Sequence, residues 1–251
     1  RKYPLADYSL TPTIAIVDPA LVMTVPGFVT ADTGMDVLTH AIEAYTSTLA
    51  NDYTDGLALQ AIKLVFENLE SSVKNADFTS REKMHNASTM AGMAFANAFL
   101  GMSHSMAHKI GGFFHTVHGR TNAILLPYVI RYNGTRPAKT STWPKYNYYR
   151  ADEKFQDIAR MLGLPSSTPE EAVDALAKAV FELGERVGIE MNFKAQGVDE
   201  KEWKETIHEI ALLAYEDQCS PANPRLPMVA HMEEILADAY FGYKERPGRL
   251  K

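Results

Sequence analysis

Residues 99–132 read FLGMSHSMAHKIGGFFHTVHGRTNAILLPYVIRY and hold four of the eight histidines in the chain. His104 and His108 are four residues apart, and on a helix this spacing places two imidazoles on one face. His115 and His118 follow just after a pair of glycines. The stretch therefore predicts a helix that presents an imidazole pair, followed by a break and two further imidazoles.

A second segment with the same spacing lies upstream, where GMDVLTHAIEAY places Asp36 and His40 four residues apart. Imidazoles with one carboxylate suit a divalent ion such as Fe(II) or Zn(II), and are too rich in nitrogen for Mg²⁺ or Ca²⁺. Without a nearby cysteine, such a site is more typical of catalysis than of a structural zinc finger. Spacing alone leaves open which four of six candidates bind the ion. The six are Asp36, His40, His104, His108, His115 and His118.

Most of the chain shows apolar residues at the three- and four-residue spacing of amphipathic helices. Besides the histidine-bearing helices, we expect helices at residues 55–73, 79–99, 121–131 (interrupted at Pro127), 151–162, 168–187, 200–215 and 227–240. The β-branched run TIAIVDP at residues 13–19 predicts one short strand. A polar and aromatic loop at 133–149 is the best internal boundary. The expected fold is mostly α: a helical bundle with one strand near its start.

Composition sets limits on the function. The chain has 251 residues, of which 46% are hydrophobic and 22% charged, as in a soluble globular protein with a sizeable core. The net charge of −6 and the lack of a Lys/Arg stripe argue against nucleic acid or an acidic membrane surface as partner. No apolar run approaches the roughly 18–20 residues of a membrane span, and residues 1–10 lack the apolar core of a signal peptide.

The single cysteine, Cys219, permits no internal disulfide, which suits a cytoplasmic protein. It has no adjacent base, so a nucleophilic role is not expected. His85, His208 and His231 stand alone in helical patterns, and we expect them to be surface or capping residues. The chain also contains neither of the common glycine-rich nucleotide-binding motifs.

The segments TADTGMDVLTHAIEAY and GMSHSMAHKIGGFFHTVHGRTNAILLPYVIRYN resemble the iron-dependent (group III) alcohol dehydrogenases. Further stretches, such as CSPANPRLPMVAHMEEILADAYFG, are similar to the C-terminal alcohol dehydrogenase half of bifunctional aldehyde-alcohol dehydrogenases. The resemblance covers nearly the whole chain. It implies the helical metal-binding domain of the iron-containing alcohol dehydrogenase, or dehydroquinate synthase-like, fold.

The resemblance also implies a site and a reaction. By the motifs of the family, the metal ligands would be Asp36, His40, His104 and His118. His108 would lie beside the nicotinamide and the substrate, as a catalytic candidate for proton transfer. The implied cofactors are Fe(II), with Zn(II) as the alternative ion, and NAD. The implied oxidoreductase reaction is the interconversion of acetaldehyde and ethanol, as in ethanol fermentation.

Members of this family have two domains, and the glycine-rich turn of the N-terminal NAD-binding domain is not found in these 251 residues. We therefore expect residues 1–251 to be the helical metal-binding and catalytic domain, with 1–20 a residual inter-domain segment and the main NAD site absent. Alone, such a chain is expected to be inactive. The resemblance further implies a homo-oligomer or filament in the full-length protein.

Two readings from other classes stay open. An Asp/His site can also generate a hydroxide nucleophile, as in a metal-dependent hydrolase. That reaction needs a carboxylate as general base, for which Glu43, one turn beyond His40, is the nearest candidate. Alternatively, the chain is a non-catalytic assembly module in which the metal only supports the fold.

Overall fold

The computed structural model describes residues 7–137 and 149–242. Nine α-helices dominate these ranges; two short 3₁₀ turns precede the first helix, and a third lies between the last two. The α-helices are α1 (Gly27–Thr46), α2 (Asp52–Lys74), α3 (Phe78–Ala98), α4 (Met102–Phe114), α5 (His118–Gly134), α6 (Ala151–Met161), α7 (Pro169–Arg186), α8 (Glu200–Tyr215) and α9 (Val229–Phe241). The 3₁₀ turns are η1 (Tyr8–Leu10), η2 (Pro19–Val22) and η3 (Ser220–Ala222).

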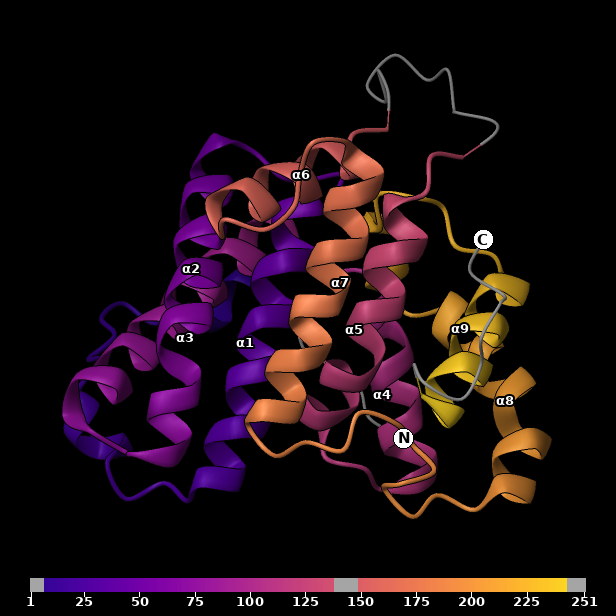
Figure 1. Cartoon of the computed structure of the whole chain (residues 1–251), viewed down its shortest axis with the longest axis horizontal. Helices are drawn as coiled ribbons and strands as arrows, with labels where there is room; N and C mark the ends of the chain where they lie inside the picture. Colours follow the sequence, from indigo (N-terminus) through magenta and orange to yellow (C-terminus); the bar gives the residue numbers. More distant parts are fainter. Residues whose placement is uncertain (1–6, 138–148, 243–251) are drawn as a thin grey trace.

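Helix α1 lies at the centre of one half of the molecule, where it packs against α2, α3 and α5 (Figure 1). It is buried on almost every side, as expected of a helix surrounded by others. Helices α8 and α9 lie together at the opposite edge, next to α4 and α5. The bundle thus consists of two groups of helices that meet along α4 and α5.

Two clusters of buried side chains correspond to these groups. The larger joins α1, α2, α3, α6 and α7, and the smaller joins α4, α8 and α9. Helix α5 contributes to both: Leu126 and Ile130 belong to the first cluster, and Leu125 and Val129 to the second. Because α5 is held on two sides, its N-terminal end has a fixed position between the two cores.

The expected strand at residues 13–19 is not seen, and no strand occurs within residues 7–137 and 149–242. The β-branched side chains of this run lie outside both cores, with Ile14 78% and Ile16 85% exposed. A strand needs a neighbour to pair with its backbone, and the described part of the chain offers none here. The β-propensity of the run is therefore not sufficient by itself to form a strand.

The helices agree with expectation more closely. Helix α8 begins and ends at the expected residues, and α6, α7 and α9 differ by one or two positions. The expected interruption at Pro127 is not observed, because α5 runs through this buried residue. Helix α1 starts at Gly27, so Thr30 and Asp32 lie inside it. Most of the expected boundary loop at 133–149 lies outside the described residues.

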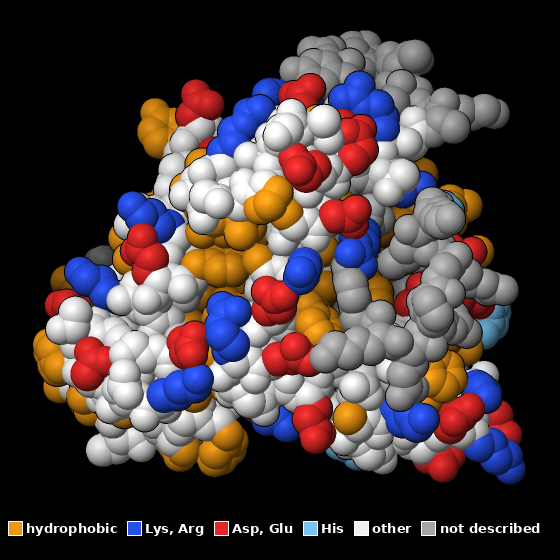
Figure 2. Space-filling model, viewed as in Figure 1, with side chains coloured by type: hydrophobic (Ala, Val, Ile, Leu, Met, Phe, Trp, Pro, Cys, Tyr) orange, Lys and Arg blue, Asp and Glu red, His pale blue; other side chains and the backbone are white. Residues whose placement is uncertain are grey.

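Acidic and basic side chains alternate over the face of the molecule shown in Figure 2, and neither sign forms a stripe there. Among the described residues, no helix is both long and apolar enough to span a membrane.

Candidate metal centre

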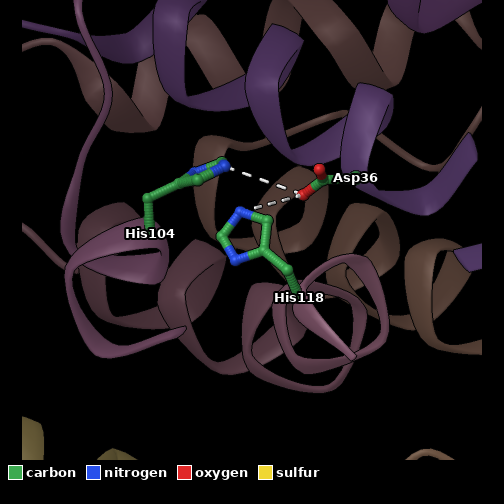
Figure 3. Close-up of side chains that lie close together, drawn as sticks. All are labelled: Asp36, His104 and His118. Atoms are coloured by element: carbon green, nitrogen blue, oxygen red, sulfur yellow. Dashed lines mark ion pairs between the residues drawn. The ribbon is translucent and has the colours of Figure 1, made fainter. Parts of the chain in front are cut away.

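Three side chains from three helices converge where α1, α4 and α5 meet (Figure 3). Asp36 comes from α1, His104 from α4, and His118 is the first residue of α5. The Oδ1 atom of Asp36 lies 3.7 Å from Nε2 of His104 and 3.8 Å from Nε2 of His118. One ligand atom of each residue lies within 4.8 Å of the other two, a spacing that fits a shared metal ion.

A glycine allows this convergence. A Cβ atom on Gly119 would lie 2.1 Å from the backbone oxygen of Asp32. The N-terminal end of α5 therefore touches the backbone of α1, and no larger residue fits at the contact. The adjoining His118 is carried by this contact to the side chain of Asp36, one turn further along α1.

The His104 ring is oriented by a buried carboxylate. Its Nδ1 atom lies 2.6 Å from Oε2 of Glu43, and Oε1 of Glu43 accepts the backbone N–H of Ser103 at 2.7 Å. Since an ionised carboxylate only accepts hydrogen bonds, Nδ1 of His104 carries the proton and Nε2 is left as the ligand atom. This Nε2 is buried and has no hydrogen-bond partner among the described residues. An orphaned buried nitrogen beside a carboxylate fits a metal ligand.

Asn122 orients the carboxylate of Asp36. Its Nδ2 atom donates to Oδ1 of Asp36 at 2.8 Å and lies 3.3 Å from Nε2 of His118. Its Oδ1 atom accepts the hydroxyl of Ser103 at 3.2 Å. Asn122 is fully buried, one helical turn after His118. Its position relative to His118 was the only sequence signal for this role.

His40 lies in the wall of the same site, and its nitrogens are not part of the three-residue group. Its ring stacks with His104 at 4.5 Å and with Phe95 at 4.6 Å between ring centroids. Burial and the neighbouring His104 lower the pKa of His40 to about 3, so the ring is neutral at physiological pH. Burial alone would raise the pKa of Asp36, but His40, His104 and His118 outweigh it and lower that pKa.

His108 lies one turn after His104 and borders the three-residue group, but it is not one of the three residues. Its ring is parallel to that of His118, with 5.4 Å between centroids and 7° between planes. Its Nδ1 atom is 3.2 Å from Oδ2 of Asp217, which also accepts from Lys109 at 2.6 Å. His108, Asp217 and Cys219 form a second group whose ligand atoms lie close together, but the Lys109 ammonium is already bonded to Asp217 there. Burial, followed by the charge of Asp217, raises the pKa of the Cys219 thiol, which makes it a poor nucleophile.

Three further histidines are not part of the group of Asp36, His104 and His118. His115 is an exposed residue at the end of α4, with a left-handed φ of 54°, and lines an open pocket together with Phe113 and Arg120. His208 pairs with Glu233 on the surface. His231 accepts the Met228 N–H at the start of α9.

Comparison with known proteins gives the chain a family. Residues 30–240 match the model of the "Fe-containing alcohol dehydrogenase family, C-terminal". The chain is 84% identical over its full length to the aldehyde-alcohol dehydrogenase of Streptococcus pneumoniae, and covers 28% of that protein. The chain therefore spans little more than a quarter of the length of this relative.

Solved structures of the same kind superimpose on the fold. The iron-containing alcohol dehydrogenase from Thermococcus thioreducens is 35% identical with a TM-score of 0.80, over 94% of this chain and 57% of that one. Sulfoacetaldehyde reductase from Bifidobacterium kashiwanohense, in complex with NAD⁺, is 29% identical with a TM-score of 0.77 over the same shares. The chain belongs to the Fe-containing alcohol dehydrogenase family and carries its C-terminal, helical part.

Proposed function

We propose that these residues form the metal-binding and catalytic side of an NAD-dependent alcohol dehydrogenase that interconverts ethanol and acetaldehyde. The observation that carries the proposal is the convergence of Asp36, His104 and His118 from three helices onto one point. The name of the S. pneumoniae relative supports the substrate class, because it joins an aldehyde and an alcohol.

The proposed ligands are Asp36, His40, His104 and His118. Three of them already surround one point, and the neutral, buried ring of His40 borders it. When bound, a divalent ion there would act as a Lewis acid that polarises the oxygen of the alcohol or aldehyde. Glu43 and Asn122 hold His104 and Asp36 in orientation, so that little rearrangement is needed.

His108 is proposed to accept the proton of the alcohol. Its ring stacks on that of His118, so it borders the place where the ligands would hold an ion and its substrate. A neutral imidazole accepts a proton at one nitrogen while it holds a proton at the other. His108 is 6% exposed, so the surrounding protein keeps most bulk water away from this step.

We propose iron(II) as the resident ion, in line with the name of the family, and zinc(II) as the alternative that the same ligands would bind. NAD is proposed as the hydride carrier, since the sulfoacetaldehyde reductase structure holds NAD⁺ on a similar fold. The 251 residues contain no glycine-rich phosphate-binding turn. The main contacts to the pyrophosphate are therefore proposed to come from outside this stretch.

The hydrolase reading loses its candidate base. Both oxygens of Glu43 are engaged, one by the His104 ring and the other by the Ser103 amide. A carboxylate used in this way orients a ligand and does not activate water. If the chain is only an assembly module, the metal has no influence on alcohol oxidation. Activity measurements distinguish this alternative from the proposed function.

Location and assembly are further parts of the proposal. A cytoplasmic location is supported by Cys219, which is buried and free. Assembly into a homo-oligomer or filament remains a prediction from the resemblance.

The ligand assignment is tested by elemental analysis of purified variants. His104→Ala and His118→Ala should each leave metal content near zero, whereas the exposed His115→Ala should retain it. His40→Ala should also lose metal if its ring turns toward the ion. Full metal content in His104→Ala, or an empty site in His115→Ala, would show that the assignment is wrong.

A further inference from the structure

Asp217 is a buried carboxylate that the metal chemistry does not use. Its side chain is 2% exposed and lies just beyond the C-terminal end of α8. Oδ2 accepts from Lys109 at 2.6 Å and faces Nδ1 of His108 at 3.2 Å. Oδ1 accepts the backbone N–H of Cys219 at 3.0 Å. Two successive residues of α4 are thus joined to one carboxylate.

The turn that carries Asp217 is itself fixed to α4. The Ser220 hydroxyl bonds to that of Ser105 at 3.0 Å and to the backbone oxygen of Ala214 at 2.7 Å. Ser105 lies one turn before Lys109, so the turn is bound to α4 at two levels. The carboxylate therefore cannot move far without breaking contacts at both.

The ammonium of Lys109, 2.6 Å from Oδ2, and the Cys219 N–H, 3.0 Å from Oδ1, favour the ionised form of Asp217 without any contribution from His108. Burial alone would raise the pKa of Asp217, but the hydrogen bonds from His108, Lys109 and the Cys219 amide outweigh burial and hold that pKa well below its usual range. An ionised carboxylate accepts hydrogen bonds and cannot donate them. The proton between Asp217 and His108 must therefore belong to Nδ1 of the imidazole.

This arrangement fixes the other ring nitrogen. When Nδ1 of a neutral imidazole carries the proton, Nε2 has the lone pair and acts as acceptor. The two nitrogens lie on different sides of the ring, so Nε2 points away from Asp217. The same ring stacks on His118, a proposed metal ligand. The His108 ring therefore borders the metal group while its Nδ1 side is bonded to Asp217.

We propose that Asp217 is a positioning residue for His108, which it holds with Nδ1 protonated and Nε2 ready to accept the proton of the alcohol. The inference rests on the proposed function, because that function gives His108 its proton. If Asp217 served only to form an ion pair with Lys109, the same two side chains would be in contact. The tautomer of His108 would then not be fixed. The tautomer is therefore the quantity to measure.

The experiment is ¹⁵N NMR of the histidine-labelled chain, loaded with zinc because this ion is diamagnetic. One-bond N–H couplings identify the protonated nitrogen of each ring, and a His108→Gln sample assigns the His108 signals. We expect the His108 proton on Nδ1 in the wild type. In Asp217→Asn the amide can donate to the ring, so the Nδ1–H signal should be lost or reduced and an Nε2–H signal should appear.

Two variants serve as controls. Glu216→Gln alters the neighbouring exposed carboxylate and should leave the His108 tautomer unchanged. Lys109→Gln removes the lysine but keeps the carboxylate, so Nδ1 should stay protonated. A tautomer that changes as much in Lys109→Gln as in Asp217→Asn would overturn the proposal.

Two further results would also overturn it: an Nε2–H tautomer in the wild type, or an unchanged Nδ1–H signal in Asp217→Asn. The wild-type spectrum keeps the proposal open to refutation even where Asp217→Asn does not fold. Zinc content is measured on the same samples. If the proposed metal function is wrong, the samples will contain no bound zinc. This result is separate from any result on the tautomer.

Discussion

Glu43 holds the His104 imidazole by the nitrogen opposite the proposed ligand atom. We expect Glu43→Gln to weaken metal binding by about 10–100-fold, because a neutral amide orients the ring less firmly and lowers its basicity. Competition with a chromophoric chelator measures the affinity. Glu67→Gln, an exposed site on α2, is the matched control and should not change it. Equal affinity in both variants would contradict the role assigned to Glu43.

Asp77 provides a pH-dependent contribution to stability at the start of α3. Hydrogen bonds from the side chain and backbone of Ser80, and from Ser71, lower its pKa to about 2. In the unfolded chain an Asp has a pKa of about 3.9. The stabilisation is therefore fully present above about pH 4 and is lost as the pH falls through about 2.

Asp77→Ser tests this assignment, because serine keeps a capping oxygen but does not titrate in this range. Urea unfolding should show a stability difference between the two chains at pH 6 that shrinks steadily between pH 4 and pH 2. A difference that stays constant with pH would mean that the charge of Asp77 contributes nothing.

The candidate ligands could be predicted from the sequence, while the residues that orient them could not. Asp36 and His104 belong to short, recognisable spacings. Glu43 and Asp217 act on histidines 61 and 109 positions away, and local periodicity carries no information about such contacts. In the sequence Glu43 has the spacing of a candidate base, and Asp217 has no signal of its own. The stacked position of His40 likewise depends on Phe95 from another helix.

At the scale of elements, the helices were predictable because each buries an apolar stripe that is visible in its own sequence. The prediction of a strand at residues 13–19 was wrong. A strand forms by backbone pairing between two segments, and the composition of one segment carries no information about its partner. Pro127 is the opposite case. Its local signal indicates a break, but burial on two sides keeps α5 continuous.

The contact between α1 and α5 leads to a prediction about Gly119. An added Cβ would meet the Asp32 backbone at 2.1 Å, so Gly119→Ala must push the two helices apart. We expect a loss of stability of about 1–3 kcal/mol, typical of overpacking, together with weaker metal binding. Thermal unfolding followed by circular dichroism and a metal titration measure the two effects.

Gly92→Ala in α3 is the control for Gly119→Ala. No atom lies within 4 Å of its added Cβ, so this variant should be neutral or more stable by up to about 1 kcal/mol. Normal metal affinity in Gly119→Ala would show that the helix contact does not set the geometry of the site.

For the whole molecule, removal of the ion should lower stability. An ion present at about 100 times its dissociation constant stabilises the native state by about 2.7 kcal/mol. In a chain of this size, stripping it with a chelator should lower Tm by about 5–10 °C. His104→Ala should show no such change. A wild-type Tm that does not respond to chelator would argue against a bound ion.

Activity is a property of more than these helices. A chain of these 251 residues alone should bind metal but form no NADH from ethanol, because no phosphate-binding turn in it holds the cofactor next to the substrate. Joining it to an N-terminal nucleotide-binding domain of the family should restore the reaction. Ordinary enzyme rates from the 251 residues alone would mean that they contain cofactor-binding groups not identified above.

The hydrogen bond between Asn122 and Asp36 spans 86 positions of the chain. At about 5–20 residues per second, a ribosome delivers the second residue roughly 4–17 s after the first. During that interval helix α5 is not yet complete, so the Asp36 carboxylate has no Asn122 beside it and the group that Asp36 forms with His104 and His118 cannot assemble. Binding of the metal ion to the site therefore follows the docking of α5 onto α1. Since nitrogen-rich sites bind zinc more tightly than iron(II), the ion in the mature protein depends on which metal the cell supplies at that moment.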